Sequence, residues 1–187
     1  MSDIQAAAID PRQFRNTLGR FASGVTVITT QYGDQPHGMT ANAFVSVSLK
    51  PPLVLVSVDN RAMMNRLLPQ TRRFGVSILA EGQEYLSNHF AGRTFEEIEV
   101  RFIRRREMPL IDDAAAYLVA AIVDIHIAGD HTLYIGEVAY IEWTDTKPLL
   151  FYAGRYHQLP VERMAPLPWP EDEFSLFSIG SIDPPVK

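Results

Sequence analysis

The stretch from His37 to Ser48 gathers small, hydroxyl and amide side chains of the kind that bind a ligand. It reads HGMTANAFVSVS, and its polar residues lie in or beside an expected strand. Small residues allow a flat or phosphorylated ligand to approach the backbone, where N–H and O–H groups can donate hydrogen bonds to it. The alternative is a strand whose polar residues alternate outward to solvent, and the pattern alone favours that alternative.

A second polar segment, Ser57-Val58-Asp59-Asn60, ends an expected strand just before an expected helix. Free backbone N–H groups at a helix N-terminus attract anions, so this segment is a candidate phosphate site. The alternative is an ordinary helix cap, which is the more common use of Asp and Asn at such a position.

The sequence lacks the motifs of several other chemistries. It has no cysteine, which excludes thiol nucleophiles, thiol redox pairs and cysteine-ligated metals. No two glycines stand two residues apart, so the dinucleotide fingerprint GxGxxG is absent. Two GxxxxG spacings occur, but Val25 and Met39 stand where a phosphate loop requires lysine. The five histidines show no metal-site pairing, so we expect no metal, and any redox activity must come from a bound cofactor.

Length and composition favour one ordinary globular domain over 1–187. The chain has 187 residues, of which 47% are hydrophobic and 21% charged, and this length supports a sizeable core. Its net charge of -5 argues against nucleic acid as a partner. The apolar run over 114–123 is about half of the roughly 20 residues that span a bilayer, and MSDIQAAAID shows no secretory signal. We therefore expect no membrane partner and a cytoplasmic location.

The first 60 residues predict a short helix followed by three strands. Asp10-Pro11 starts an amphipathic helix that runs to about Ala22. Its apolar residues recur at spacings of four and three, at Phe14, Leu18 and Phe21. Strand patterns follow in GVTVITTQY, in MTANAFVSVSL and in LVLVSV.

The remainder of the chain predicts more strands than helices. Asn60 can cap a helix through RAMMNRLL that Pro69 closes, and a second helix covers 84–90. Strand patterns occur in RRFGVSILA and LLFYAG, and YLVAAIVDIHIA and HTLYIGEVAYIEW flank Gly129-Asp130 as arms of a long hairpin. Short connections between many strands predict a mainly β fold, an antiparallel β-barrel with a few covering helices. Residues 160–187 are rich in proline and acids and form an expected C-terminal arm or loose tail.

Four runs of the sequence resemble, in order, the signatures of the flavin reductase-like family with the FMN-binding split β-barrel. They are FRNTLGRFASGVTVITT, HGMTANAFVSVSLKPPLVLVSV, GDHTLYIGEV and LLFYAGRYHQL. The resemblance covers about 11–159 as the core of the domain and leaves the tail uncovered. It implies a flavin reductase that transfers a hydride from NADH, with NADPH as an alternative, to FMN or FAD. Proteins of this family are homodimers that hold the flavin at the dimer interface and supply reduced flavin to a partner monooxygenase.

The resemblance also implies a set of binding residues. Those expected to hold the flavin ring edge and ribityl chain are Met39, Thr40, Ala41, Asn42, Ser46 and Ser48. Those expected beside the ribityl phosphate are Ser57, Val58, Asn60, Phe90 and Arg93. Those expected to contact NADH are His131, Arg155 and Tyr156. For Arg93 the alternative to a phosphate ion pair is a solvated loop arginine.

Hydride transfer between two stacked rings requires mainly placement, so such an enzyme needs no catalytic motif. His131 is the one catalytic candidate, as a positioning donor or proton source near the transferred hydride. The run from Arg101 to Arg106 could bind the 2′-phosphate of NADPH or an acidic partner, but a solvated strand face is the more common role.

Two other functions fit the same barrel. One is a flavin- or haem-binding protein without reductase turnover, because fold does not determine function. It would bind its ligand tightly and would not oxidise NADH above background. The other is an enzyme similar to the pyridoxamine-phosphate oxidases, against which the GDH and GRY signatures weigh.

Overall fold

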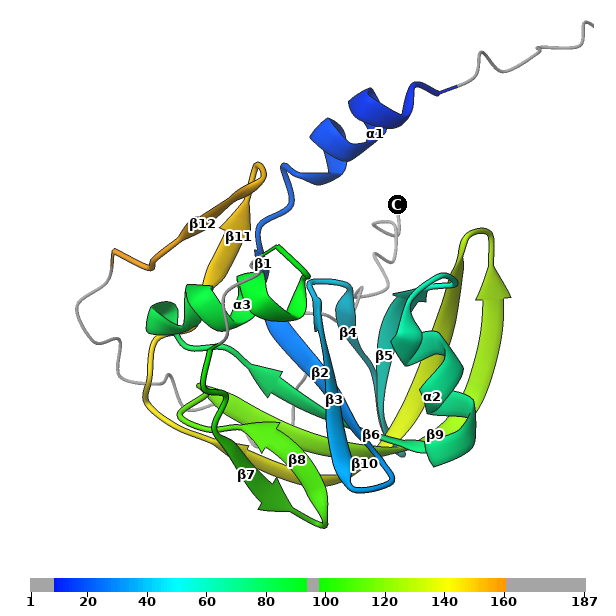
Figure 1. Ribbon diagram of the computed structural model, residues 1–187. Coiled ribbons are helices and arrows are strands. Elements are labelled where there is room, and N and C mark those ends of the chain that lie inside the picture. Colours follow the sequence, from blue (N-terminus) through cyan, green and yellow to red (C-terminus); the bar gives the residue numbers. More distant parts are fainter. Residues whose placement is uncertain (1–8, 94–97, 161–187) are drawn as a thin grey trace, which may run out of the picture.

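Seven antiparallel strands form the main sheet of the computed structural model, which describes residues 9–93 and 98–160 (Figure 1). In order across the sheet they are β3 (Gln35–Ala41), β2 (Thr26–Tyr32), β6 (Arg73–Ile78), β9 (Ala116–Ala128), β10 (His131–Trp143), β5 (Pro52–Asp59) and β4 (Phe44–Leu49). The predicted mainly β fold with antiparallel pairing is confirmed.

Two smaller sheets and the helices flank the main sheet. The remaining strands are β1 (Ser23–Gly24), β11 (Leu150–Tyr152) and β12 (Arg155–His157) in one sheet, and β7 (Phe102–Arg105) and β8 (Met108–Ile111) in the other. The helices are α1 (Pro11–Leu18), α2 (Met63–Thr71), the 3-10 turn η1 (Glu81–Gln83) and α3 (Glu84–Phe90). Of these described helices, none has the length and apolar character to cross a membrane. Of the predicted C-terminal arm over 160–187, residues 161–187 lie outside the described residues.

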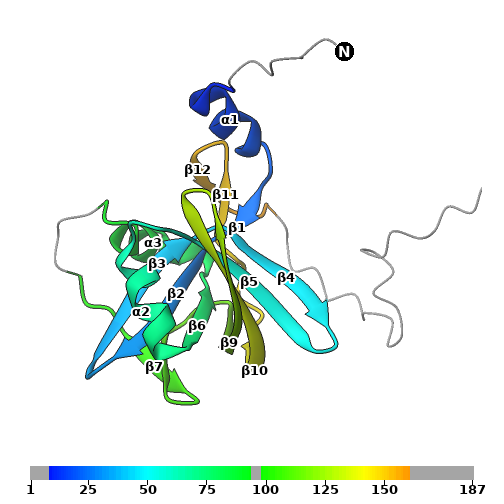
Figure 2. The same ribbon diagram turned by 90° about the vertical axis from the view of Figure 1, so that its right-hand side faces the viewer.

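The main sheet curls around one apolar core and forms a barrel. Side chains such as Ile28, Phe74 and Tyr134 meet inside it, together with Met64 and Leu68 of α2. In the described part of the chain no ladder joins the outermost strands β3 and β4, so the barrel is split between them. Figure 2 shows α2 and α3 on one side of the barrel and β4 and β5 on the opposite side. The prediction of a barrel with covering helices is therefore confirmed.

The longest strands, β9 and β10, form the hairpin predicted around Gly129-Asp130. Gly129 has a φ of 64°, a backbone conformation that glycine adopts readily. The neighbouring strand β5 pairs with β10 only over 131–137. The last part of β10 therefore has no partner on that side within the described chain, and it leaves Ile141 and Trp143 exposed.

The run MTANAFVSVSL, expected as one strand, is divided between two strands at opposite edges of the sheet. β3 ends at Ala41 and pairs with β2, whereas β4 begins at Phe44 and pairs with β5. The chain therefore has to leave the ladder at Asn42 and Ala43, although the residue pattern continues. The prediction was wrong here because the pairing partners, which lie elsewhere in the sequence, decide where the strand ends.

Asn60 does not cap α2 as predicted, because the β9–β10 turn uses its hydrogen-bonding groups. The N-cap is Ala62. The backbone N–H of Asn60 donates to the carbonyl of Asp130 at 2.9 Å, and its side-chain oxygen accepts from Thr132 Oγ1 at 2.7 Å. Asn60 thus fastens the end of β5 to the tip of the long hairpin.

Pro69 does not end α2 as predicted but lies inside it. Proline has no backbone N–H, so the carbonyl four residues earlier, that of Asn65, loses its helical partner. The hydroxyl of Tyr134 lies 3.2 Å from this Asn65 carbonyl and 2.5 Å from Asn65 Oδ1, so the two oxygens share its one proton. A buried side chain from β10 therefore places a donor beside the carbonyl that lacks its helical partner, and the helix continues to Thr71.

The first helix begins as predicted but ends earlier. The carboxylate of Asp10 accepts two backbone N–H groups of the first turn, at 2.7 and 2.8 Å. The helix stops at Leu18 rather than near Ala22, and Gly19 is its C-cap. The carbonyl of Gly19 accepts the N–H of Ala153 at 2.8 Å, so a contact with the β11–β12 turn replaces the next helical turn.

Candidate functional site

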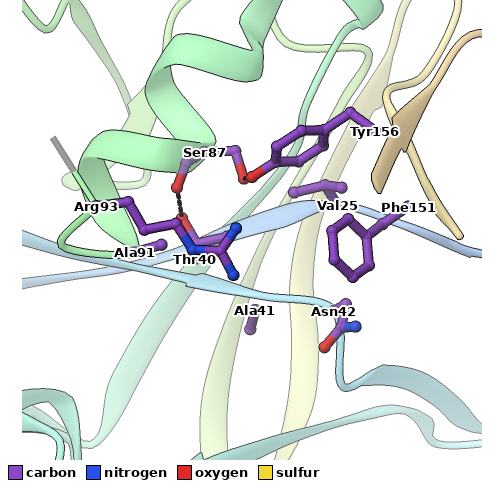
Figure 3. A pocket seen from close by; sticks show the side chains of 9 residues that line it. All are labelled: Val25, Thr40, Ala41, Asn42, Ser87, Ala91, Arg93, Phe151 and Tyr156. Carbon is purple, nitrogen blue, oxygen red and sulfur yellow. Dashed lines mark hydrogen bonds between the residues drawn. The ribbon is translucent and has the colours of Figure 1, made fainter. Parts of the chain in front are cut away.

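A cavity of about 160 Å³ lies between the end of β3, the helix α3 and the small sheet that contains β11 and β12 (Figure 3). Its lining residues are Val25, Thr40, Ala41, Asn42, Ser87, Ala91, Arg93, Phe151 and Tyr156. The cavity therefore forms where elements that are distant in the sequence converge.

Ser87 holds these elements together. It is fully buried on α3, and its carbonyl accepts the hydroxyl of Thr40 from β3 at 2.7 Å. Its own hydroxyl lies 2.8 Å from the hydroxyl of Tyr156 on β12. Tyr156 donates its proton to Asn88 Oδ1 at 3.2 Å, so Ser87 is the donor to Tyr156. Side-chain hydrogen bonds thus fix β3, α3 and β12 around the cavity.

Phe151 and Tyr156 form the aromatic wall of the cavity. They are direct partners in the β11–β12 ladder. Their rings meet edge to face, with centroids 5.4 Å apart and planes at 65°. This arrangement is favourable for two aromatic rings and presents apolar ring surface to the cavity.

Arg93 is the only cation among the described residues that line the cavity. It follows α3 after Gly92, whose φ of 66° turns the chain out of the helix. The backbone N–H of Arg93 donates to the carbonyl of Asn88 at 2.9 Å, which holds the turn. In Figure 3 the Arg93 side chain extends from α3 toward the middle of the lining residues. An exposed guanidinium in this position can bind a phosphate or carboxylate.

The lining suits a flat ring that carries a phosphate. Phe151 offers a ring surface, Asn42 offers an amide donor and acceptor, and Arg93 offers a positive charge. The volume of about 160 Å³ is small beside the roughly 300–1,000 Å³ of ordinary ligand pockets. One chain can therefore enclose only part of such a ligand.

The structure brings together a subset of the residues predicted to bind flavin and NADH. Those that line the cavity are Thr40, Ala41, Asn42, Arg93 and Tyr156. Arg155, next to Tyr156 on β12, is exposed and is not part of the lining.

Predicted residues on β4 and β5 lie outside the cavity lining. Ser46 and Ser48 are on β4, the edge strand, where Ser46 is exposed. Ser57 and Val58 are on β5, and Val58 is 1% exposed within the barrel core. Contact between these residues and a ligand stays a prediction.

Met39 and Phe90 contact the protein interior. Met39 packs against the barrel core. Phe90 lies against Gly38, where an added Cβ would come within 2.5 Å of the ring, and its centroid is 6.4 Å from that of Phe102. These contacts position β3 and α3 relative to each other, and direct contact of either residue with a ligand stays a prediction.

His131 and Asn60 lie near the tip of the β9–β10 hairpin rather than in the cavity lining. His131 Nδ1 is 2.7 Å from Asp130 Oδ1, and this hydrogen bond lowers the pKa of Asp130. Hydrogen bonds from Arg61 hold the pKa of Asp59, the partner of His131 across the ladder, far below its usual value. The hairpin tip therefore gathers two hydrogen-bonded pairs, His131 with Asp130 and Arg61 with Asp59.

Four lining residues were missed in the sequence: Val25, Ser87, Ala91 and Phe151. Ser87 and Ala91 stand four apart, which places them on one face of the helix that was predicted correctly over 84–90. That spacing could have identified them. The positions of Val25 and Phe151 depend on β1 pairing with β11, for which the sequence carries no local signal.

The basic run 101–106 lies on the β7–β8 hairpin, and none of its residues lines the cavity. Arg105 Nε is 2.8 Å from Glu142 Oε2 and 3.0 Å from the hydroxyl of Tyr140, and these bonds raise the pKa of Arg105. Arg104 donates to Gln31 Oε1 at 3.2 Å. These side chains tie the hairpin to the main sheet.

Residues 18–160 match the family model described as the flavin reductase like domain. All lining residues of the cavity fall inside this segment.

Two curated relatives match most of the chain. An NADH-dependent flavin reductase from a Rhodococcus species is 49% identical over 154 residues, which cover 81% of this chain and 88% of that protein. The reductase subunit of a flavin-dependent monooxygenase from Mycobacterium tuberculosis is 34% identical over 172 residues, which cover 89% of this chain and 92% of that protein.

Solved structures share the fold. A flavin reductase in its native state superposes with a TM-score of 0.80 at 49% identity, covering 81% of this chain and 99% of that chain. An NADH:FAD oxidoreductase from Streptomyces globisporus, in complex with NAD and FAD fragments, gives a TM-score of 0.73 at 40% identity, covering 86% and 98%. The predicted split-barrel fold is confirmed.

Proposed function

Because the chain belongs to the flavin reductase-like family, we propose that it is an NADH-dependent flavin reductase that supplies reduced flavin to a separate monooxygenase. The observation that carries this proposal is the cavity inside the matched segment. There Asn42, Arg93 and Phe151 combine the amide, charge and ring surface that suit a flavin. Relatives named as an NADH-dependent flavin reductase and as a monooxygenase reductase subunit support both parts.

The role of the chain in this reaction is to position the flavin and the NADH. FMN or FAD held here would supply the ring that accepts a hydride from NADH, and this transfer would require aligned rings rather than a reactive side chain. Arg93 would hold the flavin phosphate with charge-assisted hydrogen bonds. Asn42 would hydrogen-bond the polar edge of the ligand, while Phe151 and Val25 would pack against it and exclude water. Ser87 keeps Tyr156 in position, so that the walls of the site do not move apart.

We propose that the working protein is a homodimer. Some of the residues predicted to bind flavin lie at the cavity, whereas Ser46 and Ser48 lie on the edge strand β4. The cavity of one chain is too small for a whole flavin. A second copy would cover the remaining ligand surface along β4. The other residues predicted to bind flavin would then support the site from the protein interior or contact the flavin through their backbone, and these are Met39, Ser57, Val58, Asn60 and Phe90.

We also propose that 1–187 is one domain with its core over about 11–159. The matched segment 18–160 supports this extent of the core. The cytoplasmic location stays a prediction.

Replacing His131 by alanine is expected to raise the Michaelis constant for NADH or to slow hydride transfer about tenfold, with flavin affinity nearly unchanged. The reason is that we propose His131 to contact the nicotinamide ring, while Arg155 and Tyr156 contact the rest of the dinucleotide. His126→Ala is the matched control, because His126 lies on the same hairpin and also pairs with an aspartate, at 2.9 Å. Unchanged stopped-flow reduction in His131→Ala would remove His131 from the site.

Replacing Tyr156 by phenylalanine is expected to weaken FMN binding about 2- to 10-fold, since one hydrogen bond contributes roughly 0.5–1.5 kcal/mol. Ser87→Ala should have a smaller effect, because it breaks only the bond to Tyr156, whereas Tyr156→Phe also breaks the bond to Asn88. Fluorescence titration of FMN should then show that the double variant is no weaker than Tyr156→Phe alone. Additive losses would mean that Tyr156 and Ser87 act separately.

Steady-state oxidation of NADH tests the proposed function. Purified protein is mixed with NADH or NADPH and with FMN or FAD, and the four rates are compared with protein-free mixtures. We expect oxidation of NADH at a rate that depends on the flavin concentration. Background rates in all four mixtures, with or without a tightly bound ligand, would favour a binding protein without turnover.

A further inference from the structure

Asn88 of α3 is not among the described residues that line the cavity, but it hydrogen-bonds to two of them. Its side-chain oxygen accepts the hydroxyl proton of Tyr156 at 3.2 Å. Its backbone carbonyl accepts the N–H of Arg93 at 2.9 Å. In Figure 3 Arg93 and Tyr156 lie on opposite sides of Ser87, the residue before Asn88. Asn88 therefore connects the residue proposed to hold the flavin phosphate with a residue proposed to contact the dinucleotide.

The turn that carries Arg93 is held by backbone hydrogen bonds. The N–H groups of Ala91, Gly92 and Arg93 donate to carbonyls of α3 at 2.9–3.0 Å, which is the usual end of a helix with glycine in a left-handed conformation. All three residues are exposed, and within the described chain the Arg93 side chain forms no hydrogen bond or ion pair. A phosphate bound by Arg93 would restrain this turn, and with it the end of α3 at Asn88.

Tyr156 depends on α3 for its position. In the part of the chain that the structure describes, β12 pairs only with β11, so the other edge of β12 forms no ladder. The Tyr156 hydroxyl lies 2.8 Å from that of Ser87 and donates its own proton to Asn88. Without the Asn88 side chain this proton would lose its acceptor, and Tyr156 would keep one of its two side-chain hydrogen bonds to α3.

We propose that Asn88 is a positioning residue that couples the two halves of the site, so that a flavin phosphate at Arg93 strengthens binding of the dinucleotide at Tyr156. The restrained turn fixes Asn88, and Asn88 fixes the Tyr156 hydroxyl, so the second ligand has less conformational freedom to remove. By linkage, the dinucleotide strengthens binding of the phosphate by the same factor. This proposal rests on the proposed function, which places the two ligands at Arg93 and Tyr156.

The residue type at position 88 allows the coupling to be tested in a folded protein. Asparagine forms helices weakly, and position 88 lies inside α3. Alanine is the strongest helix former, so Asn88→Ala removes the bond to Tyr156 while it raises the helix propensity of α3. The backbone carbonyl that accepts from Arg93 stays in the variant. Circular dichroism and thermal unfolding should show that Asn88→Ala is folded.

Equilibrium titration with NAD⁺ tests the coupling without turnover, because NAD⁺ cannot reduce the flavin. Binding of FMN and of riboflavin is followed by fluorescence, with and without saturating NAD⁺. Riboflavin has no phosphate for Arg93, so it reports only the contact between NAD⁺ and the flavin ring. NAD⁺ should increase the affinity for FMN at least about fivefold more than the affinity for riboflavin. Equal gains for the two flavins would overturn the proposal.

The difference between the two flavins should disappear in Asn88→Ala. Tyr156→Phe breaks the same link from its other end and should also abolish the difference. Glu84→Ala is the matched control, because Glu84 is exposed on the same helix one turn earlier, and it should keep the wild-type difference. A wild-type difference in Asn88→Ala, or a lost difference in Glu84→Ala, would overturn the proposal, since the coupling would then not depend on Asn88.

Kinetics separate the coupling from the proposed function. With FMN, the Michaelis constant for NADH should rise in Asn88→Ala by a larger factor than kcat falls. Wild-type NADH oxidation above background, with equal NAD⁺ gains for FMN and riboflavin, would overturn the coupling alone. Coupled binding of NAD⁺ and FMN without any NADH oxidation would overturn the proposed function and leave the coupling in place.

Discussion

Replacing Arg93 by alanine is expected to weaken FMN binding about 10- to 100-fold. Arg93 is the only cation among the described residues that line the cavity. A hydrogen bond to a charged group contributes roughly 1.5–3 kcal/mol, and 1.4 kcal/mol corresponds to about a factor of ten in affinity. Because Arg93 is exposed, the free energy of unfolding should not change.

Riboflavin provides the sharpest control for Arg93, because it has the same ring system but no phosphate. Fluorescence titrations should show that Arg93→Ala loses affinity for FMN and keeps its affinity for riboflavin. Arg66→Ala, which removes an exposed arginine on α2, should bind both ligands as the wild type does. Equal losses for FMN and riboflavin would contradict a phosphate contact.

Replacing Gly136 by alanine is expected to destabilise the barrel by about 1–3 kcal/mol. An added Cβ would lie 2.6 Å from the ring of Phe74 and 2.8 Å from the Cβ of Ala120. Both neighbours are fully buried, so neither can move into solvent to make room. For a chain of this size the melting temperature should fall by roughly 2–4 °C for each kcal/mol.

The control for Gly136→Ala is Gly82→Ala, where an added Cβ meets nothing within 4 Å. Urea unfolding of all variants is compared at one protein concentration, because the stability of a dimer depends on concentration. Gly82→Ala should unfold as the wild type does. Equal urea midpoints for Gly136→Ala and the wild type would contradict the prediction, because they would mean that Phe74 and Ala120 move apart at little cost in stability.

Elements with strong local signals could be predicted from the sequence. The long hairpin follows from alternating β-branched residues on both sides of Gly129-Asp130. The bounds of α3 follow from Leu86 and Phe90, which stand one turn apart. In both cases the local preference and the tertiary contacts agree.

Elements that depend on distant partners could not be predicted in the same way. The break at Asn42 exists because β3 and β4 belong to opposite edges of the sheet. Pro69 is tolerated inside α2 because Tyr134, on a distant strand, places a donor beside the carbonyl that lacks its helical partner. Asn60 does not cap α2 as expected, because it hydrogen-bonds to the turn at Asp130 instead.

The site residues also divide into those with a sequence signal and those whose role depends on distant contacts. Thr40, Asn42 and Arg93 were predicted from the family resemblance, and the structure places them at one cavity. Ser87 carries no such signature, since its role arises from contacts with Thr40 and Tyr156 that are far away in the sequence. Conversely, His131 belongs to a signature but lies outside the lining of a single chain.

Anaerobic rapid mixing tests directly whether the protein reduces flavin, because it follows the flavin itself and excludes reoxidation by oxygen. The protein with FMN or FAD is mixed with excess NADH, and the loss of the oxidised-flavin absorbance is recorded. For a flavin reductase we expect the absorbance to fall at a rate that increases with protein concentration and saturates with NADH concentration. Rates equal to those of protein-free mixtures, with both flavins, would contradict it.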